Sequence, residues 1–131
     1  MSIEKPVIRP RRLRRTPIMR RMVAETAVRP ANLVLPAFVR EGIDEPVPVS
    51  TMPGVVQHSR ESLRKAASEA ASAGIGGIML FGVPETKDAM GSGALDPDGI
   101  LNVAIADVVS EVGDALTVMS DLCLEDRKSV V

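Results

Sequence analysis

The sequence predicts an α/β fold built around a parallel β-sheet. Three short, continuous apolar segments, at 32–39, 77–82 and 117–122, have the length and composition of buried strands. Two longer segments with apolar residues at helical spacing lie between them, at about 59–74 and 98–113. Strands that alternate with helices in this way are typical of a parallel sheet whose two faces are both covered.

The composition fits one globular domain in a reducing compartment. Of the 131 residues, 45% are hydrophobic and 25% are charged, which is ordinary for a folded domain. The only aromatic residues are Phe38 and Phe81, so the core must be aliphatic. A single cysteine cannot form an internal disulfide, and no segment approaches the roughly 20 apolar residues of a membrane span. These features favour a cytoplasmic protein.

Charge is distributed unevenly along the chain. Residues 1–29 contain nine basic and two acidic residues, a net charge of +7, whereas the remainder contains seven basic and fifteen acidic residues, a net charge of −8. Three prolines and the absence of apolar periodicity in residues 1–17 predict an extended arm that is not a packed element. These opposite charges predict attraction between the arm and the rest of the chain, or between copies of the chain.

The first strand contains a proline at an unusual position. Residues 32–39 form an apolar run between Pro30 and a charged turn, with the Val and Phe content of a strand. Pro36 has no N–H to donate to a neighbouring strand, so we expect strain, a bulge or an exposed edge there. Further along, Pro53 and Gly54 fit a type II turn, in which proline fixes the first central residue and glycine supplies a positive φ.

Both helices have recognisable ends. The first begins after Ser59, whose side chain can cap it, and ends before Gly74. Its inner face is rich in alanine, which predicts close packing on the sheet. The second helix opens at Asp98 and Gly99 and closes at Gly113. The expected inner faces contain Leu63, Ala66, Ala67, Ala70 and Ala73 in the first helix and Leu101, Ala104, Ile105, Val108 and Val112 in the second.

Asp121 and Cys123 are the candidate site residues, because they lie at the carboxyl end of the third strand, where parallel sheets place their chemistry. Residues two apart on a strand point to the same side. A carboxylate and a thiol placed in this way can bind a divalent metal or act on a substrate amine. The alternative is structural, with Cys123 as a small buried residue and Asp121 as a cap.

Three other motifs have both a functional and a structural interpretation. The loop around Gly91 and Gly93 could bind a phosphate through its N–H groups, but no Lys-Ser or Lys-Thr pair follows, which favours an ordinary flexible loop. His58 is the only histidine, so we expect a loop residue near the first helix and neither a histidine-based zinc site nor a catalytic triad. The arginine-rich segment 9–15 could bind nucleic acid, but it lacks stacking aromatic residues, and an intersubunit arm is an equally good interpretation.

The predicted sheet is incomplete, because three strands leave two unpaired edges. A (β/α)₈ barrel of about 250 residues repeats the same strand and helix unit eight times. The chain contains fewer than half of those units, which predicts that it represents part of a larger fold.

Five segments carry a resemblance to a known family. In order, they are RPRRLRR, ANLVLPAFV, STMPGVV, GGIMLFGVPETKDAMGSGALDPDG and VMSDLCL. From about Arg9 to Glu125 the chain resembles delta-aminolevulinic acid dehydratase, also called porphobilinogen synthase, particularly the bacterial enzymes of actinobacterial type. The resemblance implies a TIM-barrel enzyme that condenses two molecules of 5-aminolevulinate to porphobilinogen, with loss of two waters, early in tetrapyrrole and haem synthesis. It also implies a homo-octamer in which the arm embraces a neighbouring subunit, so the expected partner is protein and not nucleic acid.

The resemblance also implies roles for three residues. Asp121 matches the active-site aspartate of the family, and Cys123 matches the first cysteine of the zinc-binding cluster in metal-dependent members. Glu125 falls where other members have a second cysteine or an aspartate. Zinc or magnesium is therefore the implied cofactor, with Cys123 and Glu125 as ligands and Asp121 as the catalytic residue.

The resemblance is lost near the end of the chain. After Glu125 the family continues into a His-Gly-His-Cys-Gly segment, whereas this chain reads RKSVV near its end. The two Schiff-base lysines of the family match nothing here, and Lys87 is a different lysine. We therefore expect an arm at 1–29, the first barrel units at 30–125 and an aberrant tail at 126–131, in a truncated fragment that is inactive alone. The alternative function is a basic-armed module that binds nucleic acid or assembles oligomers.

Overall fold

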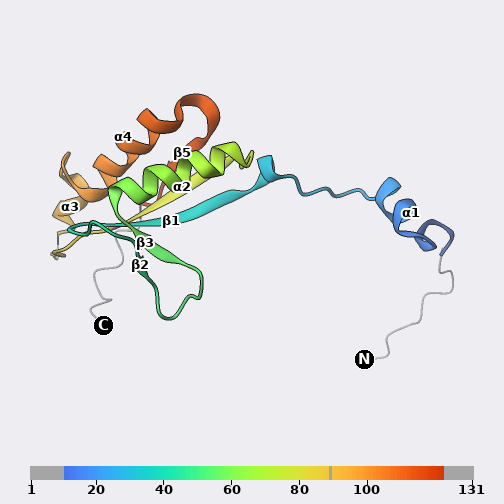
Figure 1. Ribbon diagram of the computed structural model, residues 1–131, viewed down its shortest axis with the longest axis horizontal. Helices are drawn as coiled ribbons and strands as arrows, with labels where there is room; N and C mark the ends of the chain where they lie inside the picture. Colours follow the sequence, from blue (N-terminus) through green and yellow to red (C-terminus); the bar gives the residue numbers. More distant parts are fainter. Residues whose placement is uncertain (1–10, 89, 123–131) are drawn as a thin grey trace.

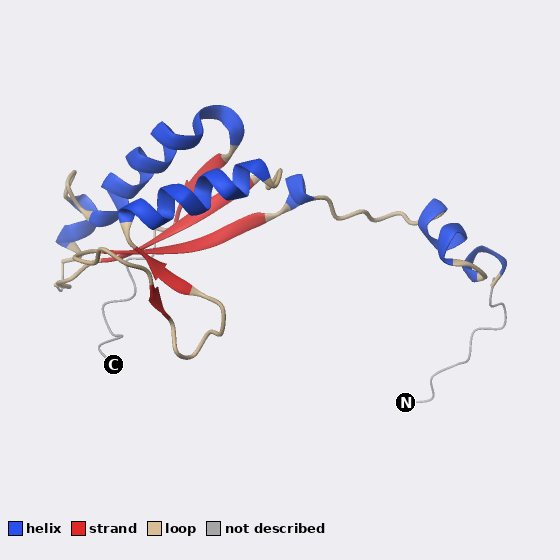
Figure 2. Cartoon of the chain, in the orientation of Figure 1, coloured by secondary structure: helices blue, strands red, loops and turns tan. Residues whose placement is uncertain are grey.

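The computed structural model describes residues 11–88 and 90–122. Within them, a five-stranded sheet in the order β2-β3-β1-β4-β5 carries helices on one face (Figures 1 and 2). Three successive strands of this sheet, β1 (Val34–Arg40), β4 (Gly77–Val83) and β5 (Thr117–Ser120), pair in parallel. They confirm the three predicted strands.

The two long helices are also where the periodicity places them, with α2 at Arg60–Ser72 and α4 at Ile100–Val112. Both pack on the same face of the sheet, so the prediction of cover on both faces is wrong for the described residues (Figure 1). The order of the strands explains this result. Because β4 lies beside β1, and β5 is added beyond β4 in the same direction, two connections of the same hand place both helices on one side. Parallel strands that are added in one direction, with all connecting helices on one side, are the arrangement found in the wall of a (β/α)₈ barrel.

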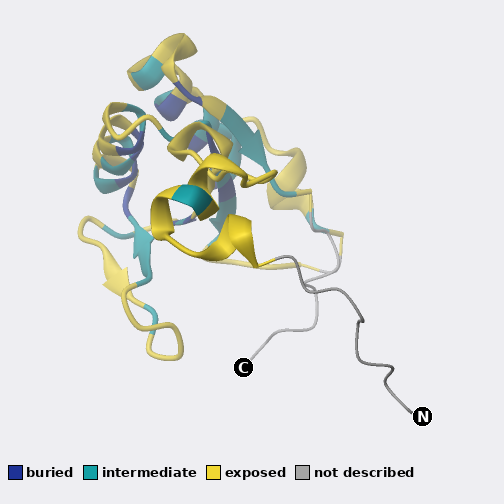
Figure 3. Ribbon diagram, turned by 90° about the vertical axis from the view of Figure 1, so that its right-hand side faces the viewer, coloured by how far each residue is buried: buried dark blue, intermediate teal, exposed yellow. Residues whose placement is uncertain are grey.

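Strand alternation separates a buried face from an open face. Paired residues of β1 and β4 share a face, and alternate pairs point toward the helices, where an aliphatic core forms. Figure 3 shows the buried positions, in dark blue, on the strands and on the helices. The other face carries Phe38 and Phe81, which are only half-buried. The core residues between helices and sheet are at most 4% exposed and include Ala37, Val39, Leu63, Ala67, Ala70, Ile78, Leu80, Ala104 and Val108.

The ends of α2 confirm the predicted capping residues. Ser59 Oγ accepts a hydrogen bond from Ser62 N–H at 3.3 Å, which satisfies one of the free N–H groups of the first turn. At the other end, Gly74 adopts a φ of +75°, the left-handed conformation that glycine accepts without a steric penalty. Three small or branched side chains, Leu63, Ala67 and Ala70, form the buried stripe, so α2 lies close to the sheet.

Pro36 lies within β1 without a bulge, because β1 and β4 pair in continuous register over all seven residues of each strand. One step after β1, Glu41 N–H donates to Val83 O at 3.0 Å, so the odd-numbered residues of β1 bond to β4. Pro36 therefore turns its backbone to the other side, where β3 pairs only with Phe38 and Val39. Of the three outcomes expected at Pro36, the exposed edge is confirmed.

A small hairpin that the sequence analysis did not predict extends the sheet beside β1. It consists of β2 (Val47–Pro48) and β3 (Val56–His58), which are antiparallel to each other, while β3 is parallel to β1. The predicted turn lies between them. Val55 N–H donates to Met52 O at 3.0 Å across Pro53 and Gly54, and Gly54 has a φ of +84°, as a type II turn requires.

The described part of the arm, residues 11–29, stands apart from the sheet and helices (Figure 1). It contains a short helix that was not predicted, α1 (Pro17–Met22), which starts at a proline and is capped by Thr16. None of the residues of α1 is buried.

The remaining elements are single turns. They are η1 (Arg12–Arg14), η2 (Pro30–Asn32), α3 (Ser92–Leu95) and η3 (Gly113–Ala115). Among residues 11–88 and 90–122, no helix combines the length and the hydropathy needed to cross a membrane.

Candidate active site at the carboxyl ends of the strands

Asp121 lies one residue beyond β5, at the carboxyl end of the parallel strands. Its N–H donates to Leu80 O at 3.1 Å, which continues the pairing of β5 with β4. Leu80 is paired with Ser120, so the next step places Asp121 beside Phe81, on the open face of the sheet. Asp121 is half-buried there. The sequence therefore predicted its position correctly.

An aromatic pair lies in the same row as Asp121. Phe38 and Phe81 are paired across β1 and β4, and their ring centroids are 5.3 Å apart with a tilt of 36° between the planes. This geometry is within the favourable range for aromatic pairs. The row across the sheet thus consists of two apolar rings followed by a carboxylate, which can hold an organic molecule and contact its amine.

The metal-binding prediction concerns residues that the structure does not describe, since Cys123 and Glu125 both lie beyond residue 122. Within residues 11–88 and 90–122, no three His, Cys, Asp or Glu side chains are grouped as a metal site. Asp121 alone does not provide the donor set that zinc or magnesium requires. The described residues therefore do not form a metal site by themselves.

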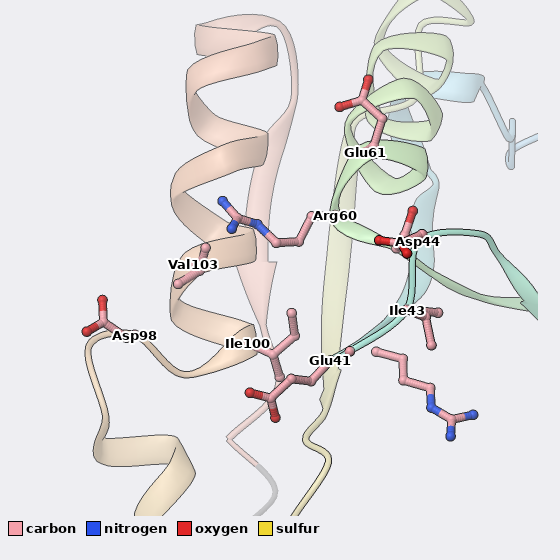
Figure 4. Close-up of a pocket in the computed structure, with 11 residues that line it drawn as sticks. Glu41, Ile43, Asp44, Arg60, Glu61, Asp98, Ile100 and Val103 are labelled. Carbon is pink, nitrogen blue, oxygen red and sulfur yellow. The ribbon is translucent and has the colours of Figure 1, made fainter.

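A hollow of about 420 Å³ lies at the same end of the sheet, on the side covered by the helices. The end of β1 and the first turns of α2 and α4 line it (Figure 4). Because Asp121 is on the opposite face, the sheet separates this hollow from the candidate site. The charged groups that line it are Arg40, Glu41, Asp44, Arg60, Glu61 and Asp98.

His58 lies near the start of α2, as expected, but it is the last residue of β3 and not the loop residue that the sequence predicts. Its Nδ1 is 3.2 Å from Ser62 Oγ, and that hydroxyl also donates to Ser59 O at 3.2 Å. Burial lowers the pKa of His58 below its usual value, because the charged imidazolium loses solvation. Ser59 and Ser62 both make hydrogen bonds within the first turn of α2. This cluster therefore caps the start of a helix and does not resemble a hydrolytic triad.

The loop with Gly91 and Gly93 uses its N–H groups internally. Asp88 Oδ1 accepts hydrogen bonds from Met90 N–H at 2.9 Å and from Ser92 N–H at 3.0 Å, and Oδ2 accepts from the Ser92 hydroxyl. The Ser92 hydroxyl and these N–H groups hold the pKa of Asp88 below its usual value. The N–H groups of Met90, Gly91 and Ser92 are thus bonded to Asp88, which supports the structural interpretation of this loop.

Sequence reasoning missed Glu41, which connects two strand ends. Its carboxylate Oε2 accepts a hydrogen bond from Glu85 N–H at 2.8 Å, although the two residues are 44 positions apart. The available signal was its place, because Glu41 is an acidic residue directly after a buried strand and directly before a glycine.

The chain is similar to known proteins in both sequence and structure. A family model described as delta-aminolevulinic acid dehydratase matches residues 7–129. The delta-aminolevulinic acid dehydratases of Streptomyces coelicolor and Mycobacterium tuberculosis are 67% and 58% identical to the chain over 123 residues. Among solved structures, the Toxoplasma gondii delta-aminolevulinic acid dehydratase in complex with the reaction product porphobilinogen matches with a TM-score of 0.80 at 35% identity.

These matches cover most of this chain but only part of each relative. The two bacterial alignments cover 92% of the chain and 37% of the relative, and the structural match covers 87% of the chain and 32% of the other protein. The chain therefore spans about a third of the length of the relatives that it matches, and its fold is part of a TIM barrel. The family match includes 126–129, four of the six residues that we expected to form a separate tail.

Proposed function

The chain belongs to the delta-aminolevulinic acid dehydratase family, and we propose that it forms the N-terminal part of a porphobilinogen synthase. The proposed reaction condenses two molecules of 5-aminolevulinate to porphobilinogen with release of two waters. The structure with a TM-score of 0.80 to this chain holds porphobilinogen, which supports this substrate class. The activity is proposed for a longer protein to which this chain contributes one part.

The position of Asp121 is the observation that carries the proposal. Barrel enzymes place their catalytic groups at the carboxyl ends of the strands, facing the interior of the barrel mouth. Asp121 lies at that end, on the face of the sheet that the helices leave open, beside Phe81. In a closed barrel this face is the interior. A residue on the helix side of the same strand, such as Ser120, would not reach it.

Asp121 has a proton-transfer or amine-binding role in this proposal. A carboxylate near a substrate amine accepts its hydrogen bonds and can take or return a proton while carbon–nitrogen and carbon–carbon bonds form. The apolar ring of Phe81, the neighbour of Asp121 in the row, would exclude water from one side of that carboxylate. The two Schiff-base lysines implied by the family must come from the part of the longer protein that this chain does not match.

Further features of the proposal concern metal, assembly and location. Cys123 and Glu125 would bind zinc or magnesium, which supplies Lewis-acid chemistry when bound, and none of the steps above depends on it. Residues 1–29 would contact a neighbouring copy in a homo-octamer, which the exposed arm and the opposite charges of the arm and the remainder support. The proposed location is the cytoplasm, where the substrate would be supplied.

A chimaera tests the proposal. Residues 11–122 would replace the matching segment of the Streptomyces coelicolor relative, and porphobilinogen formation from 5-aminolevulinate would be measured. We expect activity in the parent graft and a loss of about 10²-fold or more in Asp121→Asn, because a positioned acid or base contributes about 10²–10⁴-fold. Asp114→Asn, an exposed acid in η3, is the matched control and should retain activity. A folded but inactive parent graft, or a fully active Asp121→Asn, would contradict the proposal.

A further inference from the structure

Glu41, directly after β1, makes one hydrogen bond to the last residue of β4 and one to the connection that follows it. Its backbone N–H donates to Val83 O at 3.0 Å, and its carboxylate Oε2 accepts from Glu85 N–H at 2.8 Å. Both partners follow from the register, since Arg40 pairs with Val83 and the next step places Glu41 opposite Pro84. One residue thus contacts the chain on both sides of a proline that has no N–H to donate.

The carboxylate replaces a backbone carbonyl in this arrangement. In a parallel ladder, a residue donates its N–H to the residue before its opposite number and accepts at its C=O from the residue after it. Glu41 makes the first of these bonds with Val83, but Glu85 N–H goes to the side chain of Glu41. The side chain therefore extends the pairing by one bond after the two backbones have begun to separate.

Gly42 explains why the backbones separate at this point. It adopts a φ of +70°, in the left-handed region that favours glycine, and so turns the chain out of the sheet directly after Glu41. A Cβ at this position would lie 3.5 Å from a carboxylate oxygen of Glu85, which shows how closely the two connections approach. The longer reach of the Glu41 side chain bridges the space that this turn opens.

The bond between the Glu41 carboxylate and Glu85 N–H holds the start of the connection that follows β4, the strand next to the candidate site. Residues 84–99 leave the end of β4, and β4 is the strand paired with β5, which leads to Asp121. The middle of this connection is held internally by Asp88. Its first residues are held to β1 by Glu41. Loss of that bond would release the start of the connection, which begins at Pro84, three residues after Phe81, the β4 residue beside Asp121.

We infer that Glu41 is a positioning residue, which acts from the helix side of the sheet and whose carboxylate fixes the connection that follows β4, the strand beside Asp121. This inference rests on the proposed function for its catalytic meaning, whereas the structural bond can be measured independently of activity. This role requires a hydrogen-bond acceptor at the end of a side chain that is as long as glutamate. Glutamine provides that acceptor without the charge, and alanine does not.

Hydrogen exchange of the full 131-residue chain tests the bond. The Glu85 amide should exchange about tenfold more slowly in the parent than in Glu41→Ala, because a hydrogen bond to a charged acceptor is stronger than a neutral one. Glu41→Gln should retain at least half of this roughly tenfold protection when the exchange rates of the Glu85 amide are compared on a logarithmic scale. The control is Glu45→Ala, which removes the same charge from the segment that follows β1. It should leave the exchange rate of the Glu85 amide unchanged. Equal exchange of Glu85 in the parent and in Glu41→Ala overturns the inference.

Kinetics of the chimaera test the positioning role. We expect Glu41→Ala to lower kcat by about tenfold with KM changed less than about twofold, because misplacement near the reacting groups costs rate more than binding. Glu41→Gln should restore most of kcat, and Glu45→Ala should match the parent. Failure of glutamine to restore kcat overturns the positioning role. An inactive parent graft argues against the proposed function, while the exchange of the Glu85 amide still decides whether the bond exists.

Discussion

Arg60 and Asp107 form a two-point ion pair that joins the first turn of α2 to the middle of α4. Arg60 Nε is 2.7 Å from Asp107 Oδ2, and Nη2 is 2.9 Å from Oδ1, so the two planar groups meet side by side. Asp107 is mostly buried, with 17% of its side chain exposed, whereas the Arg60 side chain is 55% exposed. The hydrogen bonds from Arg60 lower the pKa of Asp107. The pair thus fixes the spacing of two helices that share one face of the sheet.

A double-mutant cycle on Arg60→Ala and Asp107→Ala should give a coupling free energy of about 0.5–1 kcal/mol, because Arg60 remains open to solvent. The sign of the pH dependence follows from the lowered pKa of Asp107. Its contribution is present above the unfolded value, about 3.9, and is lost as pH falls through the lower folded value. Urea unfolding followed by circular dichroism at neutral and acidic pH measures both effects. A coupling that persists unchanged at pH well below the folded pKa would contradict this assignment.

Removal of the hydrogen bond that caps α2 should lower the stability of the folded sheet and helices. Ser59 is 3% exposed, and its hydroxyl oxygen accepts from Ser62 N–H, so Ser59→Ala leaves that N–H without its partner. We expect a loss of about 1 kcal/mol in the free energy of unfolding, and recovery in Ser59→Asp. Ser68→Ala, at an exposed position in the middle of the same helix, should be neutral or slightly stabilising. Equal effects of the two alanine variants would argue against the cap.

His58 should titrate below the ordinary range for histidine. Burial lowers its folded pKa, while its unfolded value stays near about 6.5. The unfolded state therefore binds more protons between these two values, so stability decreases as pH falls from about 6.5 through the folded pKa. His58 is the only histidine, which gives a single proton NMR titration curve to measure. The variant His58→Gln should lose this part of the pH dependence. A folded pKa above the unfolded value would reverse the sign and refute the prediction.

The open face should make the isolated chain prone to association. Met79, Phe38, Phe81 and Met119 share this face, and the helices cover only the opposite one. We expect binding of a hydrophobic dye and concentration-dependent light scattering, with both reduced in Met119→Lys. Val109→Lys, which adds the same charge to a position on α4 that is 48% exposed, is the control and should change neither. A soluble monomer that unfolds cooperatively and binds no dye would count against this expectation.

The 131-residue chain alone should form no porphobilinogen, with zinc or magnesium supplied. The proposed reaction uses a buried lysine amine as the nucleophile for each substrate, and Lys65 and Lys87 are both exposed. Lys5 and Lys128 lie outside the described residues. A colorimetric assay and borohydride trapping with mass spectrometry provide the measurement. Turnover together with a stoichiometric adduct on any of these lysines would disprove the expectation.

Sequence reasoning succeeded where the signal is local. The apolar runs, the cap at Ser59 and the glycine at position 74 each act within a few residues, and the structure confirms them. Asp121 was found because it directly follows an apolar strand. The family resemblance is confirmed by a match over residues 7–129.

The features that were missed depend on contacts between distant segments. A two-residue strand such as β2 has no periodicity of its own and exists because β3 pairs with it. The cover of only one face by helices follows from the order of the strands, which apolar patterns do not encode. Glu41 is recognisable only when Glu85, 44 positions away, is brought beside it.

The touching rings of Phe38 and Phe81 give this protein an unusual optical property. The sequence contains no tryptophan or tyrosine, and these two are its only phenylalanines. All of its aromatic near-ultraviolet absorption and emission therefore originates from one spot on the open face, where the rings are 5.3 Å apart. Any molecule or added strand that covers that face must change this signal, whereas events confined to the arm leave it unchanged. The chain thus carries its own spectroscopic probe beside Asp121.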